Sequence, residues 1–203
     1  MNNEYLDDLK EIKEIMHRSS RFISLSGLSG VANGGAALIG VYLAYELIFK
    51  NNNLLSYDAN ILQSDQLVYL IAIAIGTILL AAGSSIYFTY IKNKADEEPA
   101  WDLQTRRLIY SLCIPLCTGG LLCFILLMKG FVGLTPAMTL IFYGLALVNS
   151  SKFTSGDIHK LGIMEIILGL VCLLFIEYSL ILWAIGFGVL SIVYGVIIQM
   201  KDK

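Results

Sequence analysis

Charged residues are scarce in this sequence. Asp, Glu, Lys and Arg make up 15% of its 203 residues, whereas 57% of the residues are hydrophobic. A soluble domain of this length has about a quarter of its residues charged, because it must cover its surface with them. The formal net charge of -2 also leaves no basic surface for nucleic acid. The composition therefore excludes a soluble or nucleic-acid-binding domain and indicates a protein whose main solvent is lipid.

Motifs that carry chemistry are missing as well. The sequence has no phosphate-binding P-loop, no His-Glu-x-x-His metal motif and no Gly-x-Ser-x-Gly nucleophile motif. Its histidines, His17 and His159, lie outside the long apolar runs, and its four cysteines lie within them, which is typical of buried reduced thiols. We therefore expect no catalytic residue, no metal site and no cofactor, and we interpret the chain as non-enzymatic.

Long apolar runs dominate what is present. A transmembrane helix needs roughly 20 apolar residues, and backbone groups in lipid must be paired within the spanning segment. The alternating pattern of membrane barrel strands does not occur. The sequence thus predicts an all-α, polytopic membrane helical bundle with six transmembrane helices. They are expected at about residues 22–48, 67–91, 108–128, 131–153, 161–176 and 180–200.

Lys and Arg residues fall mainly on one side of these spans. All of them except Lys50 and Lys129 lie before the first span, between the second and third, at the connection of the fourth and fifth, or after the sixth. Cytoplasmic loops carry the excess of positive residues, so both termini are expected in the cytoplasm. The tail at 201–203 is then cytoplasmic as well.

Residues 1–21 precede the membrane domain, and residues 4–18 have an amphipathic helical pattern. Apolar side chains such as Leu9, Ile12 and Met16 recur at helical spacing, with charged residues between them. This cytoplasmic helix can lie against membrane lipid or the end of the bundle, or it can dock a protein partner. Two heptads are too short to favour a coiled coil strongly.

The first span has a small, polar face opposite a bulky apolar one. Gly30 and Gly34 form a small-x-x-x-small pattern that lets helices approach closely in lipid. Asn33 lies near the middle of the membrane, where its amide needs a partner. One interpretation is an interhelical hydrogen bond that sets the packing. The other is a polar group that lines a substrate or water cavity.

The fifth span carries a carboxylate on its small-residue face, because Gly162, Glu165 and Gly169 recur at helical spacing. An ionisable side chain inside a membrane is costly unless it is paired or hydrated, and it is a functional candidate for that reason. One interpretation is a structural ion pair with Lys160 or with one of the arginines at 106–107. The other is a role in binding a proton or a ligand.

Other small residues mark further faces where helices can pack closely. They are Gly76 and Gly83 in the second span, and Gly188 and Gly195 in the sixth. We expect these faces to point into a compact bundle.

Two prolines interrupt the predicted helices. Pro115 removes a backbone hydrogen bond and leaves a carbonyl near Ser111 free for Thr118, another side chain or water. Thr118 is therefore the third polar candidate within the membrane, beside Asn33 and Glu165. Pro136 lies inside the fourth predicted span, so that helix can begin there after a turn over 130–135.

Four stretches of the chain carry a resemblance to one family. They are 21–30 (RFISLSGLSG), 142–153 (FYGLALVNSSKF), 161–162 (LG) with 165–169 (EIILG), and 183–190 (WAIGFGVL). These stretches resemble an uncharacterised family of six-helix bacterial integral membrane proteins, and the resemblance covers nearly the whole chain. It implies a multi-pass protein of the bacterial cytoplasmic (inner) membrane. It implies no activity, so no site residue is carried over from it.

Two functions fit these observations. The first is a membrane-embedded interaction or sensory component, in which residues 4–18 or the 92–107 loop contact a protein partner in the cytoplasm or the membrane. The second is a small transporter or a proton- or ion-coupled carrier that uses the Asn33 face and Glu165. The inverted repeat usual in transporters is not visible, so we favour the first function. A hydrated cavity joining Asn33 to Glu165 would indicate the second.

Overall fold

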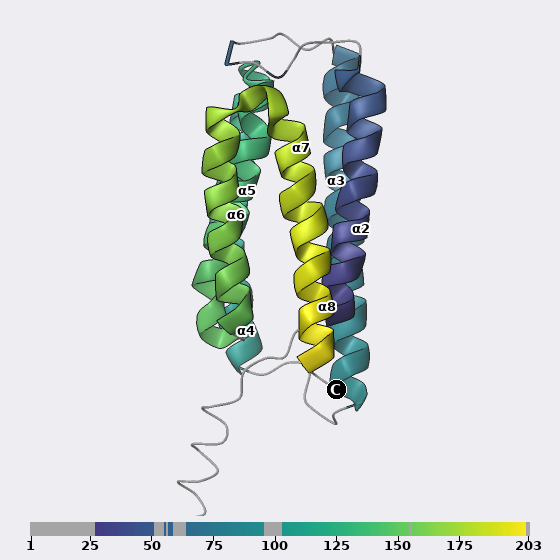
Figure 1. Cartoon of the computed structure of the whole chain (residues 1–203), viewed down its shortest axis with the longest axis vertical. Coiled ribbons are helices and arrows are strands. Elements are labelled where there is room, and N and C mark those ends of the chain that lie inside the picture. The colour runs from purple at the N-terminus through teal and green to yellow at the C-terminus, as the bar shows by residue number, and fades with distance from the viewer. Residues whose placement is uncertain are drawn as a thin grey trace, which may run out of the picture.

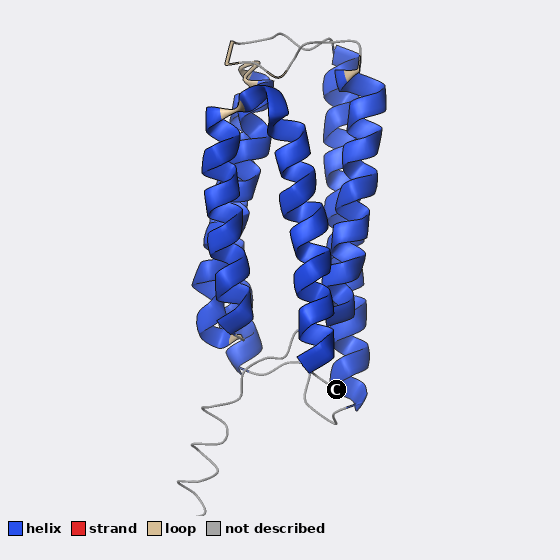
Figure 2. Cartoon of the chain, viewed as in Figure 1, coloured by secondary structure: helices blue, strands red, loops and turns tan. Residues whose placement is uncertain are grey.

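A computed structural model of the chain describes residues 27–50, 55, 57–58, 64–95, 103–154 and 156–201. Figure 1 shows long helices that run side by side, and Figure 2 shows short loops and turns, in tan, at the ends of some of them. The long runs are helical because their side chains are apolar and a helix pairs all of its interior backbone groups. The elements are α2 (Gly27–Ala44), η1 (Tyr45–Phe49), α3 (Ser64–Ala95), α4 (Leu103–Met128), η2 (Val132–Leu134), α5 (Thr135–Ser150), η3 (Ser151–Phe153), α6 (Gly156–Leu174), η4 (Ile176–Tyr178), α7 (Ser179–Trp183), η5 (Ala184–Leu190) and α8 (Ser191–Lys201).

Five helical stretches are long and apolar enough to cross a membrane. They are Gly27–Phe49, Asp65–Ile91, Thr105–Met128, Val132–Phe153 and Ile176–Met200. Their bounds lie within a few residues of five predicted spans, so a helical bundle with several candidate membrane-spanning helices is confirmed. The remaining predicted span, 161–176, corresponds to α6, which carries Asp157, Lys160 and Glu165 and is not among these five.

The turn between α4 and α5 has the local geometry that its sequence suggests. Gly130 has a φ of 84°, a conformation that glycine adopts without strain. Its backbone N–H donates to Leu127 O, and the N–H of Phe131 donates to Leu126 O, which together satisfy the last carbonyls of α4. Pro136 then lies in the first turn of α5, so this helix begins where the proline predicts.

Helices α2 and α3 pack together and form a first group, while α4, α5 and α6 form a second group. The helix formed by α7, η5 and α8 (residues 179–201), here called the bridging helix, lies between them (Figure 1). α7 packs on α5 and α6, whereas η5 and α8 contact both α2 and α6. The bridging helix therefore contacts the two groups with different parts of its length.

Three small clusters of buried side chains form the core. One lies between η1 and η2 around Ile48 and Val132, and so connects the two groups at one end. The other two lie where the second group meets the bridging helix, around Leu140 and around Leu161. Many large apolar side chains elsewhere are exposed, as expected where lipid is the solvent.

Several predictions concern residues outside this description. The amphipathic helix at 4–18 lies outside the described residues, as do positions 96–102 of the 92–107 loop and most of the tail at 201–203.

Candidate functional site

Asn33 lies at the contact between α2 and α3, where its amide is bonded to two serines. With the amide oriented to match donors with acceptors, Asn33 Nδ2 donates to Ser84 Oγ (2.6 Å) and to Ala81 O (2.9 Å). Asn33 Oδ1 accepts a hydrogen bond from Ser85 Oγ over 2.8 Å. These three partners belong to α3, whereas a fourth, Ser29 O at 3.2 Å from Nδ2, lies on the same helix as Asn33. Asn33 thus forms interhelical hydrogen bonds that join the two helices of the first group.

Glu165 lies on α6 and is fully buried, with 0% of its surface exposed. Neither of its carboxyl oxygens has a hydrogen-bond partner among the described residues. A Cβ atom built on Gly186 would lie 2.6 Å from Glu165 Oε2 and 2.5 Å from Leu140 Cδ2. The carboxyl group of Glu165 thus reaches η5, in a space that exists because residue 186 is a glycine.

The ion pair considered for Glu165 is not formed with the described cations. Lys160 lies 3.9 Å from Asp157 on the same helix instead. Positions 160 and 165 are five residues apart, which turns their side chains about 140° from each other around the helix axis. Arg106 and Arg107 are exposed on α4, whose main partner is α5. None of these three cations therefore lies at the carboxyl group of Glu165.

Glu46 shows the contrasting case of a carboxylate at a helix end. Lys50 Nζ donates a hydrogen bond to Glu46 Oε2 over 2.8 Å, and both side chains are partly exposed. This hydrogen bond, together with the charge of Glu46, raises the pKa of Lys50 above its usual value. Glu46 is thus both paired and solvated, which makes it a matched control for Glu165.

The backbone carbonyl freed by Pro115 is satisfied from another helix. Asn149 Nδ2 of α5 donates to Ser111 O of α4 over 2.9 Å. Thr118 is not the partner, because its exposed side chain donates to Ile114 O on its own helix over 2.8 Å. Sequence reasoning located the free carbonyl but missed Asn149, since only the packing of α4 on α5 brings this donor to it.

The three polar candidates are consequently not brought together. Asn33 is bonded to α3, Glu165 reaches η5, and Thr118 lies on the exposed side of α4. Sequence spacing reveals each polar residue along its own helix. The helix contact at which each one lies follows only from packing.

Glycines on α2 and on the bridging helix make their contact close. A Cβ atom on Gly30 would lie 2.9 Å from Gly195 Cα, and one on Gly34 would lie 2.6 Å from Gly188 O. A Cβ atom on Gly188 would lie 2.5 Å from Leu38 Cδ2. The α2 helix therefore touches the backbone of the bridging helix at the places where both lack side chains.

A second close contact joins α5 to α6. A Cβ atom on Gly162 would lie 2.8 Å from Gly144 O, and one on Gly144 would lie 2.6 Å from Gly162 O. A Cβ atom on Gly169 would lie 2.6 Å from Ile141 Cγ1. These glycines hold the two helices that enclose Glu165 against each other.

Gly76 and Gly83 on α3 are different. No atom lies within 4 Å of a Cβ atom built at either position, and Gly83 is exposed. The close contacts expected from these two glycines are therefore not formed within the described chain.

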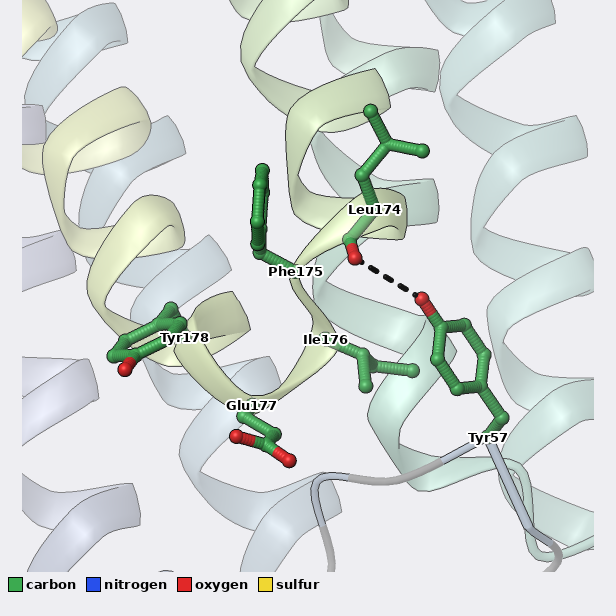
Figure 3. A pocket seen from close by; sticks show the side chains of 6 residues that line it. All are labelled: Tyr57, Leu174, Phe175, Ile176, Glu177 and Tyr178. Atoms are coloured by element: carbon green, nitrogen blue, oxygen red, sulfur yellow. Dashed lines mark hydrogen bonds between the residues drawn. The ribbon is translucent and has the colours of Figure 1, made fainter.

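A shallow pocket lies at the end of the bundle where α6 leads into α7. It has a volume of about 150 Å³ and is lined by Tyr57 and residues 174–178. Figure 3 shows Tyr57 directed at this turn, where its hydroxyl donates to the carbonyls of Leu173 and Leu174. The pocket is lined by neither Asn33 nor Glu165. It is therefore not the cavity that a carrier using both residues requires.

Comparisons with known proteins add no relative. The chain matches no protein-family model, no curated protein and no solved structure. The function is therefore argued below from the helix contacts and from Glu165.

Proposed function

We propose that the protein is a non-enzymatic sensory or interaction component of the membrane, with α6 as its sixth span. α6 is 19 residues long, close to the length needed to cross the hydrocarbon core. Asp157 and Lys160 lie within its first two turns, near one end, so Glu165 is the charged side chain that remains inside the span. Because the helices alternate in direction, the start of α2 and the end of α8 lie at the same end of the bundle (Figure 1).

The proposed orientation places both termini in the cytoplasm of a bacterial cell. Its support is the distribution of exposed cations relative to the helix ends. Arg106, Arg107, Lys152 and Lys160 lie at the end shared by the start of α2 and the end of α8, whereas Lys50 and Lys129 lie at the other end.

The observation that carries the proposed function is the construction of the bridging helix. Its central segment, η5, is a π-helix of 7 residues, a conformation that is rare and occurs frequently at functional sites. Within η5, Gly186 contacts Leu140 and Glu165 of the second group, and Gly188 contacts Leu38 of the first. One irregular segment thus touches both helix groups within two residues.

This arrangement suits a component that changes shape rather than one that performs a reaction. A shift of η5 alters how the first group sits against the second. The predicted 92–107 loop includes the last residues of α3 and the first residues of α4, which belong to different groups, so such a shift acts on both of its ends. We therefore propose that this loop and residues 4–18 contact a protein partner, and that this contact changes when the two helix groups shift relative to each other.

Disulfide locks test this function. In a variant without the four native cysteines, Leu38→Cys with Gly188→Cys ties α2 to η5, because these two positions are in contact. A photo-crosslinking residue placed at Ile12 or Trp101 then reports contact with the partner. We expect oxidation of this lock to change the yield of the partner crosslink and reduction to restore it.

A lock within one helix group is the matched control. Ile141→Cys with Gly169→Cys also pairs a glycine with an aliphatic neighbour, but it ties α5 to α6. We expect this lock to leave the partner crosslink unchanged. Repeated recovery of the protein alone, or equal effects of the two locks, would contradict the proposed function.

A carrier is the second candidate, and the unpartnered Glu165 is the observation that favours it. A carrier needs a hydrated path between Asn33 and Glu165, although the two now lie at different helix contacts. Cysteines at Ala37 and Leu168 test for such a path with a water-soluble maleimide. Labelling of both from one side of the membrane favours the carrier, and protection of both favours the sensory component.

A further inference from the structure

Glu165 is a buried carboxyl group without a partner, in the part of the protein where the second helix group meets the bridging helix. It is 0% exposed, and both of its oxygens lack a hydrogen bond among the described residues. An isolated carboxylate in such surroundings is strongly disfavoured, because nothing replaces the water it has lost. The group must therefore be neutralised in the state that the structure shows.

No described cation is placed to neutralise it. The elements packed against α6 are α5, α7, η5, α8, η3 and η4. The charged residues of η3 and η4 are Lys152 and Glu177, which lie beyond the two ends of α6 and are exposed. α5, α7 and η5 contain no charged residue, and α8 contains only Lys201 at its end. On α6 itself, Lys160 lies near Asp157, and the ring of His159 is bonded to Ser151. The other titratable side chains on α5, α6 and α8 include Tyr143, Cys172 and Tyr194, and none of these three is a cation.

A metal ion fits the surroundings poorly. The described residues contain no group of three or more His, Cys, Asp or Glu side chains that could hold a metal. Leu140, Leu168 and Gly186 approach the carboxyl group instead, and they supply carbon atoms where a cation needs several oxygen ligands. A proton needs no such ligands, since it converts the carboxylate into a neutral acid.

We infer that Glu165 is a proton-binding site within the membrane and that its proton holds the contact between α6 and η5 closed. The carboxylate accepts one proton from water to give the carboxylic acid, and it returns the same proton to water when it ionises. The inference deepens the proposed function, because it names proton activity as the signal that the sensory component detects. This sensory role rests on the proposed function. The proton site itself rests only on the geometry around Glu165.

The position of Gly186 explains how protonation acts on the fold. The neutral acid lies directly against this glycine, and the ring of the next residue, Phe187, packs on Tyr143 and Trp183 at centroid distances of 4.8 and 4.6 Å. An ionised carboxylate requires water, and water can reach it only if these contacts separate. Because Gly188 contacts Leu38, a displacement of η5 is passed on to α2.

Infrared spectroscopy of the full chain in lipid nanodiscs tests the proton site. Isotope-labelled glutamate identifies the carbonyl band of a protonated Glu side chain. At neutral pH we expect one such band in the wild type, its loss in Glu165→Gln and its retention in Glu46→Gln. A wild-type spectrum without this band, or a band that persists in Glu165→Gln, would overturn the inference.

A second variant keeps the test decisive if Glu165→Gln does not fold. Glu165→Asp keeps a carboxyl group at this position but removes the labelled glutamate, so the labelled band should disappear. A labelled band that persists in Glu165→Asp would show that another glutamate is its source.

Hydrogen exchange separates the proton site from the structural response. As pH rises, residues 184–190 of the wild type should lose protection relative to Glu165→Gln, which mimics the neutral acid at every pH. Equal protection in the two proteins would overturn the proposed effect on η5. The disulfide locks test the sensory function separately from the proton site. A confirmed proton band together with locks that do not change the partner crosslink would support the proton site and reject the sensory function.

Discussion

Two helix contacts in this protein contain a polar side chain, but they differ in the hydrogen bonds that they provide to it. At the α2–α3 contact, the amide of Asn33 is matched by Ser84 and Ser85 at ordinary hydrogen-bond distances. At the contact of α6 with α5 and η5, the carboxyl group of Glu165 meets aliphatic carbon and a glycine. The hydrogen bonds of Asn33 stabilise the packing of α2 on α3. The packing around Glu165 is favourable only while the carboxyl group is neutral.

The difference separates a structural polar residue from a functional candidate. Both residues interrupt apolar spans, and both lie beside glycines that permit close approach. A hydrogen bond between membrane helices contributes on average about 0.6 kcal/mol, so Asn33 fits the modest role of setting the helix contact. Glu165 contributes no such bond, and its burial is better explained by binding and release of a proton.

The largest effect is expected where the contact around Glu165 is broken directly. Gly144→Leu places a side chain against the backbone of Gly162, so α5 and α6 must separate. We expect a loss of about 3 kcal/mol in the free energy of unfolding, measured by denaturation in mixed detergent micelles. Gly120→Leu on α4 is the control, because nothing lies within 4 Å of a Cβ atom at Gly120. Equal losses in the two variants would show that the glycine contact is not what holds these helices together.

Removal of the amide tests the partnered side of the comparison. Asn33→Ala removes the interhelical hydrogen bonds and leaves the hydroxyl of Ser85 without its acceptor. The expected loss is about 1–2 kcal/mol in the free energy of unfolding. Ser85→Ala, measured in the same denaturation series, should lose less because it removes one bond. An Asn33→Ala protein as stable as the wild type would mean that the bonds to α3 carry no net stability.

Removal of the carboxyl group of Glu165 should increase the free energy of unfolding, whereas removal of the Asn33 amide should decrease it. Glu165→Met keeps a similar volume and replaces a buried group that has no hydrogen bond with an apolar side chain. We expect a gain of about 1 kcal/mol in the free energy of unfolding near neutral pH. The contrast is sharpest when Asn33→Ala and Glu165→Met are denatured side by side. Destabilisation by Glu165→Met would indicate a partner for the carboxyl group and would remove the basis of the comparison.

The smallest effect concerns the open face of α3. Gly83→Ala adds a methyl group beside Ser84, on the side where nothing lies within 4 Å of it. Alanine restricts the unfolded chain more than glycine, so we expect a gain of about 0.5 kcal/mol in the same assay. A clear loss would reveal that Gly83 packs against another helix in the membrane.

Much of the fold could be predicted because it depends on local properties of the chain. Five apolar runs gave helix positions within a few residues, and Pro136 gave the start of α5. The two π-helical segments, η1 and η5, could not be predicted in this way. They depart from the ordinary helical repeat, and no distinct residue pattern in the sequence indicates them.

The candidate site was predictable only residue by residue. The polar character and depth of Asn33 and Glu165 follow from their places within long apolar runs. The partners Ser84, Ser85 and Asn149 belong to other helices, and each could be named only once those helices were packed. The same limit explains why the carbonyl of Ser111 was left open to Thr118, another side chain or water before Asn149 was found there, and why a cation was considered for Glu165.

The sequence by itself determined that this protein is a bundle of apolar helices, because hydrophobicity and run length act on each segment separately. It also determined which polar side chains would need partners in such a bundle. Only the tertiary structure decided which of them obtain partners, since a hydrogen bond between helices requires both side chains at one contact and one depth. It paired Asn33 with α3 and placed Glu165, which has no hydrogen bond within the described part of the chain, against the irregular segment that touches both helix groups.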